Sequence, residues 1–190
     1  MTDTQTNATG IPGYVAGRWT IDPAHTDVSF TVRHMMVSKV RGHFATFEGE
    51  IVTGEKVEDS AVNVTVDLGS ISTNNEQRDA HLRGSDIFDA DNHEKMTYRS
   101  TAVRQDGDDW VLDGELTIKD VTKSVPLSLE VNGFGADVYG GFRAGFSAKG
   151  EISRGDFGID FNIPMEGGGV VVGDKVSIAI EVEAILNQDQ

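Results

Sequence analysis

The stretch Val62-Asn63-Val64-Thr65-Val66-Asp67-Leu68 places an apolar side chain at every second position. A period of two is typical of a β-strand that buries one face and exposes the other. The same alternation recurs on both sides of this stretch, and it predicts roughly eight or nine strands in all. The other predicted strands span residues 17–22, 27–35, 42–51, 96–104, 110–119, 124–131, 142–149 and 176–183.

Short turn signals separate several of the predicted strands. They are Asp22-Pro23, Asp106-Gly107, Asn132-Gly133 and Gly140-Gly141. Neighbouring strands joined by short turns pair antiparallel, and their apolar faces must be buried. Because no amphipathic helix is long enough to cover the sheet, the sheet must cover itself as a sandwich or a closed barrel. We favour a single antiparallel barrel of about eight strands, since closure removes exposed strand edges.

A polar segment from Ser72 to Arg83 interrupts the series of strands. Its Thr73-Asn74-Asn75-Glu76 matches the spacing of a helical capping box, and Gly84 supplies a C-terminal stop. The sequence therefore predicts one short helix after the fourth strand. The connection around it is long, as binding lids often are, and we expect Ile87 and Phe88 to pack on the barrel rim.

Length and composition indicate one all-β domain in 190 residues. We divide the chain into a disordered polar tail, residues 1–16, and a barrel, residues 17–187. The absence of cysteine excludes disulfides and thiolate chemistry. No apolar run is long enough to span a membrane, and the first residues lack the basic start and apolar core of a secretory signal. We therefore expect a cytoplasmic protein without stable membrane insertion.

The charge is strongly acidic, with 31 Asp and Glu side chains against 16 Lys and Arg, a formal net charge of −15. A field of this sign repels nucleic acid and anionic membrane surfaces, so nucleic acid is not an expected partner. The simplest interpretation is that the acidity keeps the protein in solution. Whether the chain forms a homodimer is left open by the sequence.

The interior of such a barrel can be solid or hollow, because barrels of about eight strands lie at the border between the two. Several residues on the predicted inward faces are small, which leaves room between larger apolar ones. The same small residues also suit a barrel that tapers and is filled by its own side chains. The small residues are Ala45, Gly49, Ser100, Ala102, Gly114, Ala144 and Ala148.

Five segments, in order from about residue 17 to 186, resemble the YceI-like, polyisoprenoid-binding family. Each segment alone is a weak signal, but the five in register make the resemblance specific. The segments are Trp19 to His34, Gly42-His43-Phe44 with Phe47-Glu48-Gly49, Arg78 to Arg83 with Phe88-Asp89, Gly114 to Thr122, and Arg154 to Ile159.

The resemblance implies a lipocalin-like antiparallel barrel with an apolar tunnel that holds an isoprenoid or a similar lipid. Combined with the alternation of the strands, it predicts a lipid-tail lining of twelve inward residues. The predicted lining is Phe30, Val32, Phe47, Val64, Val66, Leu112, Leu116, Phe142, Ala144, Phe146, Ala148 and Ile180.

Arg78 and His81 lie three residues apart on one side of the predicted helix, where they could hold a phosphate or a quinone carbonyl. The alternative is a surface network that only anchors the helix. The five histidines lack the spacing of a metal site on one element, so no metal is expected. No nucleophile elbow or phosphate loop is present, so the sequence does not predict an enzyme.

Two function classes remain. In the first, the protein binds or carries an amphiphilic lipid such as a polyprenyl compound or a quinone, with a role in stress as one setting, and needs no other cofactor. In the second, it is a compact structural or interaction module with a filled core and no ligand. A third and weaker hypothesis is catalysis on a lipid-like substrate through Arg78 and His81.

Overall fold

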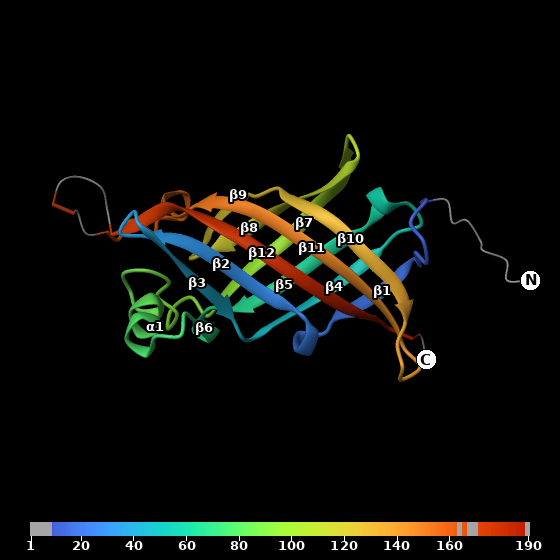
Figure 1. Cartoon of the computed structure of the whole chain (residues 1–190), viewed down its shortest axis with the longest axis horizontal. Coiled ribbons are helices and arrows are strands. Elements are labelled where there is room, and N and C mark those ends of the chain that lie inside the picture. Colours follow the sequence, from blue (N-terminus) through green and yellow to red (C-terminus); the bar gives the residue numbers. More distant parts are fainter. Residues whose placement is uncertain (1–8, 163–164, 167–170, 189–190) are drawn as a thin grey trace, which may run out of the picture.

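The computed structural model describes residues 9–162, 165–166 and 171–188. These residues form an elongated all-β barrel, with α1 at one end and the start of β1 and the end of β12 at the other (Figure 1). The elements are β1 Gly17–Ile21, β2 Asp27–His34, β3 Ser38–Phe44, β4 Phe47–Thr53, β5 Ala61–Asp67, β6 Ile71–Ser72, α1 Glu76–Arg83, β7 Lys95–Asp106, β8 Asp109–Ile118, β9 Val121–Ser124, β10 Leu127–Ala136, β11 Phe142–Ser153 and β12 Val172–Leu186.

The sheet closes on itself, which confirms the predicted barrel. Antiparallel pairing runs in the order β1-β4-β5-β7-β8-β10-β11-β12, and β12 pairs back to β1 with Leu186 opposite Trp19. This ring has the eight strands expected of a small barrel. The remaining strands extend the ring: β2 pairs with β12, β3 with β2, β6 with β3, and β9 with β8.

Three of the ring strands are interrupted, so that each continues as a second, separate strand: β1 continues as β2, β4 as β3, and β5 as β6. The strand is interrupted between β1 and β2 because Pro23 starts a 3₁₀ turn, Pro23–His25. Asp22 caps this turn, since its side chain accepts the Ala24 N–H at 3.0 Å. Both halves nevertheless lie along β12, with Ile21 opposite Ala184 and Asp27 opposite Glu181. The turn at Asp22-Pro23 therefore joins two strands end to end instead of forming a hairpin.

Two further breaks correct the predicted position of the helix. The predicted strand 42–51 is split at Ala45 and Thr46 into β3 and β4, and a two-residue β6 precedes the helix. Helix α1 consequently follows β6 and not the fourth strand. Its N-cap is Asn75, whose side chain accepts the Arg78 N–H at 2.9 Å, and not Thr73 as the capping-box spacing suggested.

Two β-bulges shift which side chains face the interior. On β7 the register against β8 slips between Ser100 and Ala102, so Ala102 is exposed and Val103 is buried. On β10 it slips between Val131 and Gly133, so Asn132-Gly133 is a bulge within the strand and not the predicted turn. The prediction that Ala102 faces inward is wrong for this reason, and Ala45 is also exposed because it lies in the break between β3 and β4.

The end of the barrel formed by β1, β11 and β12 is solidly packed. Trp19 is fully buried there, beside the equally buried pair Ala144 and Ala184, which lie opposite each other. The Trp19 indole N–H donates to Thr53 Oγ1 at 2.8 Å.

Within the described part of the chain, no helix is both long and apolar enough to cross a bilayer.

The predicted N-terminal tail divides into two parts. Residues 1–8 lie outside the described residues, whereas Ile11 and Tyr14 pack against the hydrophobic core. The Tyr14 hydroxyl donates to the carbonyl of Gly54 at 2.7 Å. This contact ties the segment that precedes β1 to the end of β4.

Candidate functional site

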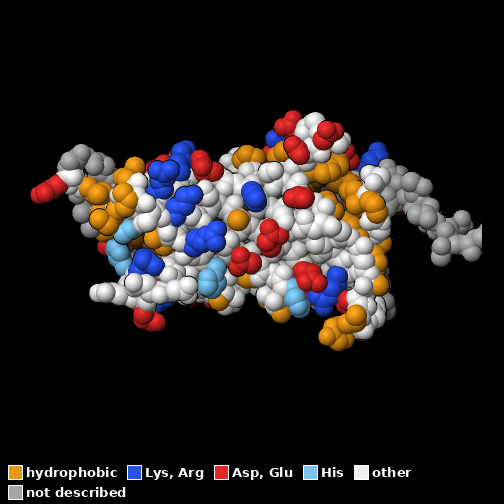
Figure 2. Space-filling model, viewed as in Figure 1, with side chains coloured by type: hydrophobic (Ala, Val, Ile, Leu, Met, Phe, Trp, Pro, Cys, Tyr) orange, Lys and Arg blue, Asp and Glu red, His pale blue; other side chains and the backbone are white. Residues whose placement is uncertain are grey.

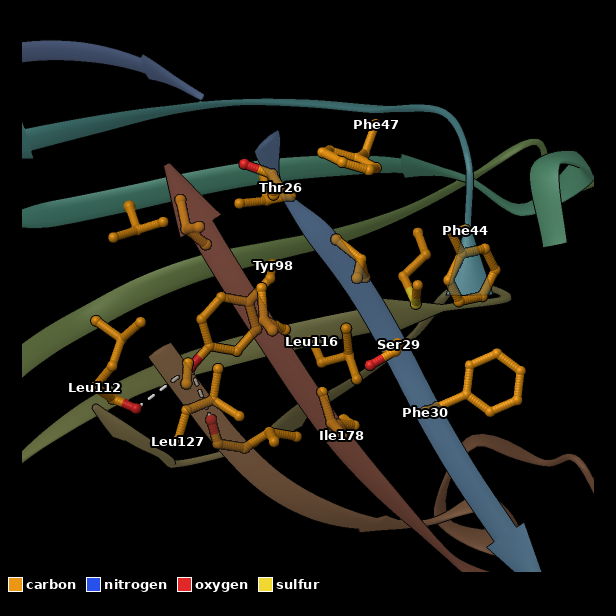
Figure 3. Close-up of a pocket in the computed structure, with 18 of the residues that line it drawn as sticks. Thr26, Ser29, Phe30, Phe44, Phe47, Tyr98, Leu112, Leu116, Leu127 and Ile178 are labelled. Atoms are coloured by element: carbon orange, nitrogen blue, oxygen red, sulfur yellow. Dashed lines mark hydrogen bonds between the residues drawn. The ribbon is translucent and has the colours of Figure 1, made fainter. Parts of the chain in front are cut away.

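An apolar cavity of about 280 Å³ runs through the barrel interior. Side chains from strands around the ring converge on it, as Tyr98, Leu116 and Ile178 do in Figure 3. The helix and the loop after it contribute Leu82, Ile87 and Phe88. The expectation that Ile87 and Phe88 pack onto the barrel is therefore confirmed.

Nine of the twelve residues predicted to line a lipid tail do line this cavity. They are Phe30, Val32, Phe47, Val64, Leu112, Leu116, Phe146, Ala148 and Ile180. The other three, Val66, Phe142 and Ala144, belong to the hydrophobic core cluster around Trp19. Phe142 and Ala144 lie at the end of the barrel that Trp19 fills, whereas Val66 packs at the α1 end, where it is paired with Phe47 and Met96.

Two aromatic rings occupy space that glycines leave on the neighbouring strand. A Cβ atom at Gly42 would come within 2.3 Å of the Phe30 Cζ, and one at Gly114 within 2.4 Å of the Tyr98 Cζ. The rings therefore lie directly over these glycines. Some of the space that small inward residues leave is therefore filled by aromatic rings, and only part of it is open cavity.

The few hydroxyl groups in the lining are bonded to the protein itself. The Tyr98 hydroxyl donates to the carbonyl of Val125 at 2.8 Å, and burial raises the pKa of Tyr98 above its usual value. Ser29 donates to the carbonyl of Ala179 at 2.9 Å, and Thr26 to that of Glu183 at 3.2 Å. Among the described residues, no buried side-chain nitrogen or oxygen lacks a hydrogen-bond partner. The cavity therefore offers a ligand apolar contact and few hydrogen bonds.

Arg154 is the charged residue of the lining, and the sequence did not single it out. It is buried, and its guanidinium donates to four carbonyl oxygens, those of Ile159, Phe161, Val172 and Gly173, at 2.9–3.2 Å. No carboxylate forms an ion pair with it in the described part of the chain. Its fifth N–H has no partner among the described residues, so Arg154 can both hold this loop against β12 and present positive charge to the cavity.

Arg78 and His81, the predicted head-group residues, lie on α1 but do not line the cavity. Arg78 donates to Thr73, from Nε to the hydroxyl at 2.7 Å and from Nη2 to the carbonyl at 2.8 Å. Buried Asp79 accepts from the backbone N–H and the hydroxyl of the same threonine. These bonds match the anchoring network that was the alternative to head-group binding.

His81 lies at the surface of the same helix. Its ring meets Phe161 edge-on, with centroids 4.8 Å apart, and its Nε2 is 3.5 Å from Asp86 Oδ2. Leu82, the next residue, faces the cavity. Helix α1 therefore contributes Leu82 to the cavity wall, and neither Arg78 nor His81. No group of three or more potential metal-ligating side chains gathers in the described residues.

Comparison with known proteins gives a consistent set of similarities. The profile of the YceI-like domain matches residues 19–184. Protein YceI of Escherichia coli is 36% identical over 174 residues, which is 90% of this chain and 88% of that protein.

Two solved structures share the fold. A YceI protein of Campylobacter jejuni matches with a TM-score of 0.67 and 30% identity, over 88% of this chain and 96% of that one. A polyisoprenoid-binding domain from Saccharophagus degradans matches with a TM-score of 0.67 over 91% of this chain and 100% of that one. Because its identity is 14%, this second likeness shows the fold alone.

Proposed function

The chain belongs to the YceI-like family, and from that premise we propose that its cavity binds one amphiphilic lipid of the isoprenoid type, such as a polyprenyl compound or a quinone. The observation that carries the proposal is the apolar lining whose hydroxyls are all bonded to the protein. A buried water needs two to four polar partners, so such a cavity favours an apolar occupant over water. The same fold occurs in a domain described as polyisoprenoid-binding, so a barrel of this fold is compatible with such a ligand.

The volume limits what part of a lipid is enclosed. At about 280 Å³ the cavity is close to the small end of ligand pockets, which span roughly 300–1,000 Å³. It suits a short prenyl or alkyl segment, and a long polyprenyl chain would extend beyond it. Burial of each CH₂ group contributes about 0.8 kcal/mol, so a tail of several carbons supplies most of the affinity.

The role of the protein follows from this kind of site. The lining is apolar apart from Arg154 and a few hydroxyls that are bonded to the protein, so the cavity offers binding contacts and no arrangement of reactive side chains, and we propose a binder or carrier and not an enzyme. A head-group role of His81, a setting in stress, a cytoplasmic location and a homodimer remain predictions. For Arg78 we favour the anchoring network over the predicted head-group role, because its guanidinium is bonded to Thr73. Arg154, which reaches the cavity, is a second candidate for contact with a polar head.

Native mass spectrometry of the protein purified from its own host tests the proposal. A co-purifying lipid of defined mass, released on denaturation, is the expected result. If several preparations carry no lipid, and added prenyl alcohol or quinone does not bind, the filled module without a ligand is the better account.

A further inference from the structure

The turn between β2 and β3 exposes three consecutive apolar side chains. Met35, Met36 and Val37 are 43%, 49% and 87% exposed. Met35 and Met36 also adopt left-handed backbone angles, with φ of 52° and 62°. Asn-Gly is the preferred pair at such positions of a two-residue hairpin turn, because larger residues are strained there. The chain thus keeps two methionines in a strained backbone conformation at positions where they stay about half exposed, and strain of this kind points to a function of the tip.

Cationic side chains flank this tip on the outer face of the same hairpin. Val32 lines the cavity, so its neighbour Arg33 points outward, and Lys39 lies directly opposite Arg33. Arg41 follows two residues along the same face of β3. All three are exposed, and none of them forms an ion pair within the described residues. The hairpin therefore carries unpaired positive charge beside an apolar tip.

The charge distribution of the whole molecule is uneven. Figure 2 shows Lys and Arg side chains gathered over the half of this face where β2 and β3 lie, with apolar side chains at the adjoining end and many acidic side chains toward the other half. Lys175 of β12 adds to the basic half, and its Nζ is 4.0 Å from Glu151. Acidic groups at this end also include Asp174, which is bonded to Ser153, and the exposed Glu166 of the loop before β12. Because charges are screened over about 8 Å at physiological salt, this patch acts locally despite the net charge of −15.

We propose that the β2–β3 hairpin tip, Met35-Met36-Val37, with Arg33, Lys39 and Arg41, is a docking surface for an anionic lipid bilayer. The methionines and the valine enter the headgroup boundary while the cations contact anionic headgroups. The sequence alone suggested repulsion from anionic membranes, and the arrangement of charge reverses this expectation at one end. Docking goes beyond lipid binding and can fail while lipid binding stands.

The hairpin is also well placed relative to the cavity. Val32 lines the cavity and lies three residues before Met35. The Met35 N–H donates to the carbonyl of Val171, just before β12, at 2.7 Å, which ties the tip to the barrel wall. A membrane-docked hairpin would thus hold this end of the barrel against the bilayer.

The opposite end of the barrel provides a matched control. Val138 and Tyr139, in the turn between β10 and β11, are 90% and 88% exposed. They follow Asp137, and the cation beside them, Arg143, is paired with Asp22, Asp137 and Glu183. This turn exposes two apolar side chains, and the cation beside it is paired, so among the described residues it lacks the free positive charge of the hairpin tip.

Vesicle sedimentation tests the proposal with the full chain. We compare vesicles of phosphatidylcholine alone with vesicles of phosphatidylcholine and phosphatidylglycerol. The variants are M35N/M36G/V37T, R33Q/K39Q/R41Q and the control V138S/Y139S. Because Asn-Gly suits the turn, the first variant should keep or raise the melting temperature, so loss of binding cannot be attributed to unfolding.

The wild type should bind only the anionic vesicles, and added salt should weaken the binding. Each Lys or Arg near an anionic surface strengthens binding about five-fold, so the triple charge variant should lose well over ten-fold, the tip variant at least several-fold, and the control nothing. Equal binding to both vesicle types, no binding to either, or an equal loss in the control would overturn the docking surface. An acidic protein partner would give the second of these results. Lipid occupancy by native mass spectrometry, measured on the same variants, reports separately on the proposed function.

Discussion

The ring of Tyr98 lies across Gly114 of the neighbouring strand, so closely that a Cβ atom there would be 2.4 Å from the Tyr98 Cζ. Tyr98 and Gly114 are diagonal neighbours in the β7–β8 pair, since Tyr98 is opposite Leu116. The ring thereby reaches over β8 to the carbonyl of Val125. One glycine thus decides where a large aromatic side chain lies in the cavity wall.

Gly114→Ala should destabilise the barrel because it displaces the Tyr98 ring and breaks its partly buried hydrogen bond to Val125. Overpacking of a core costs about 1–3 kcal/mol, and the loss of the hydrogen bond adds roughly 1 kcal/mol. Denaturant unfolding measures the change. Gly135→Ala is the control, since a Cβ atom there meets nothing within 4 Å. Equal stability of the two variants would contradict this account of Tyr98.

The free energy of unfolding should depend on the ionisation of Asp22 at acidic pH. The guanidinium of Arg143, 2.8 Å from Asp22 Oδ2, and a hydrogen bond from His25 lower the pKa of Asp22 from 3.8 to about 2. Because the folded pKa lies below the unfolded one, the ionised carboxylate stabilises the fold above pH 3.8, and this contribution is lost as the pH falls toward 2. Asp22→Asn should therefore be less stable than the wild type at neutral pH.

The difference between Asp22→Asn and the wild type should shrink steadily as the pH falls through this range. Chemical unfolding at a series of pH values gives the comparison. A constant difference between the two proteins down to pH 2 would show that Asp22 is not stabilised as a carboxylate.

Arg78→Ala should lower stability and leave head-group preference unchanged. The guanidinium is bonded to Thr73 and lies outside the cavity, so its loss loosens α1. A hydrogen bond from a charged group contributes about 1.5–3 kcal/mol. Binding of a prenyl phosphate and of the matching prenyl alcohol should weaken to the same degree. Selective loss of the phosphate would restore Arg78 as a head-group ligand.

Arg154→Gln should behave differently, since Arg154 lines the cavity. The variant loses charge-assisted bonds to the carbonyls of the 159–161 segment and β12, so unfolding should become easier by several kcal/mol. If the remaining N–H contacts a polar head, prenyl phosphate binding should fall more than prenyl alcohol binding. Unchanged stability would mean that the four hydrogen bonds from Arg154 to carbonyl oxygens do not hold the 159–161 segment against β12.

The alternation of apolar residues was sufficient to predict the barrel and most inward faces, because a one-sided strand can be satisfied only by burial. The positions that failed are those where the backbone departs from a regular strand. The bulge after Ser100 turns Ala102 outward, and the break at Ala45 divides one predicted strand into two. A bulge or a break leaves little trace in a pattern of period two.

The cavity was predicted in part for a related reason. Phe30 and Ala148 face inward and line it, but Ala144 does not, because Trp19 fills that end. How far a cavity extends depends on which large side chain reaches it from another strand. Arg154 was missed because a cation followed by Gly155-Asp156 resembles a surface turn, and only the folded chain brings four carbonyls around it.

The most direct test of the central claim is lipid occupancy of Ala148→Trp. Ala148 lines the cavity, so an indole there should fill ligand space, whereas Ala102→Trp places the same side chain on the outer face. Native mass spectrometry and melting temperature are measured on both variants. We predict that Ala148→Trp loses bound lipid with little change in melting temperature, and that Ala102→Trp retains the lipid. A marked fall in the stability of Ala148→Trp, with no lipid in the parent protein, would show a filled barrel and contradict the proposed function.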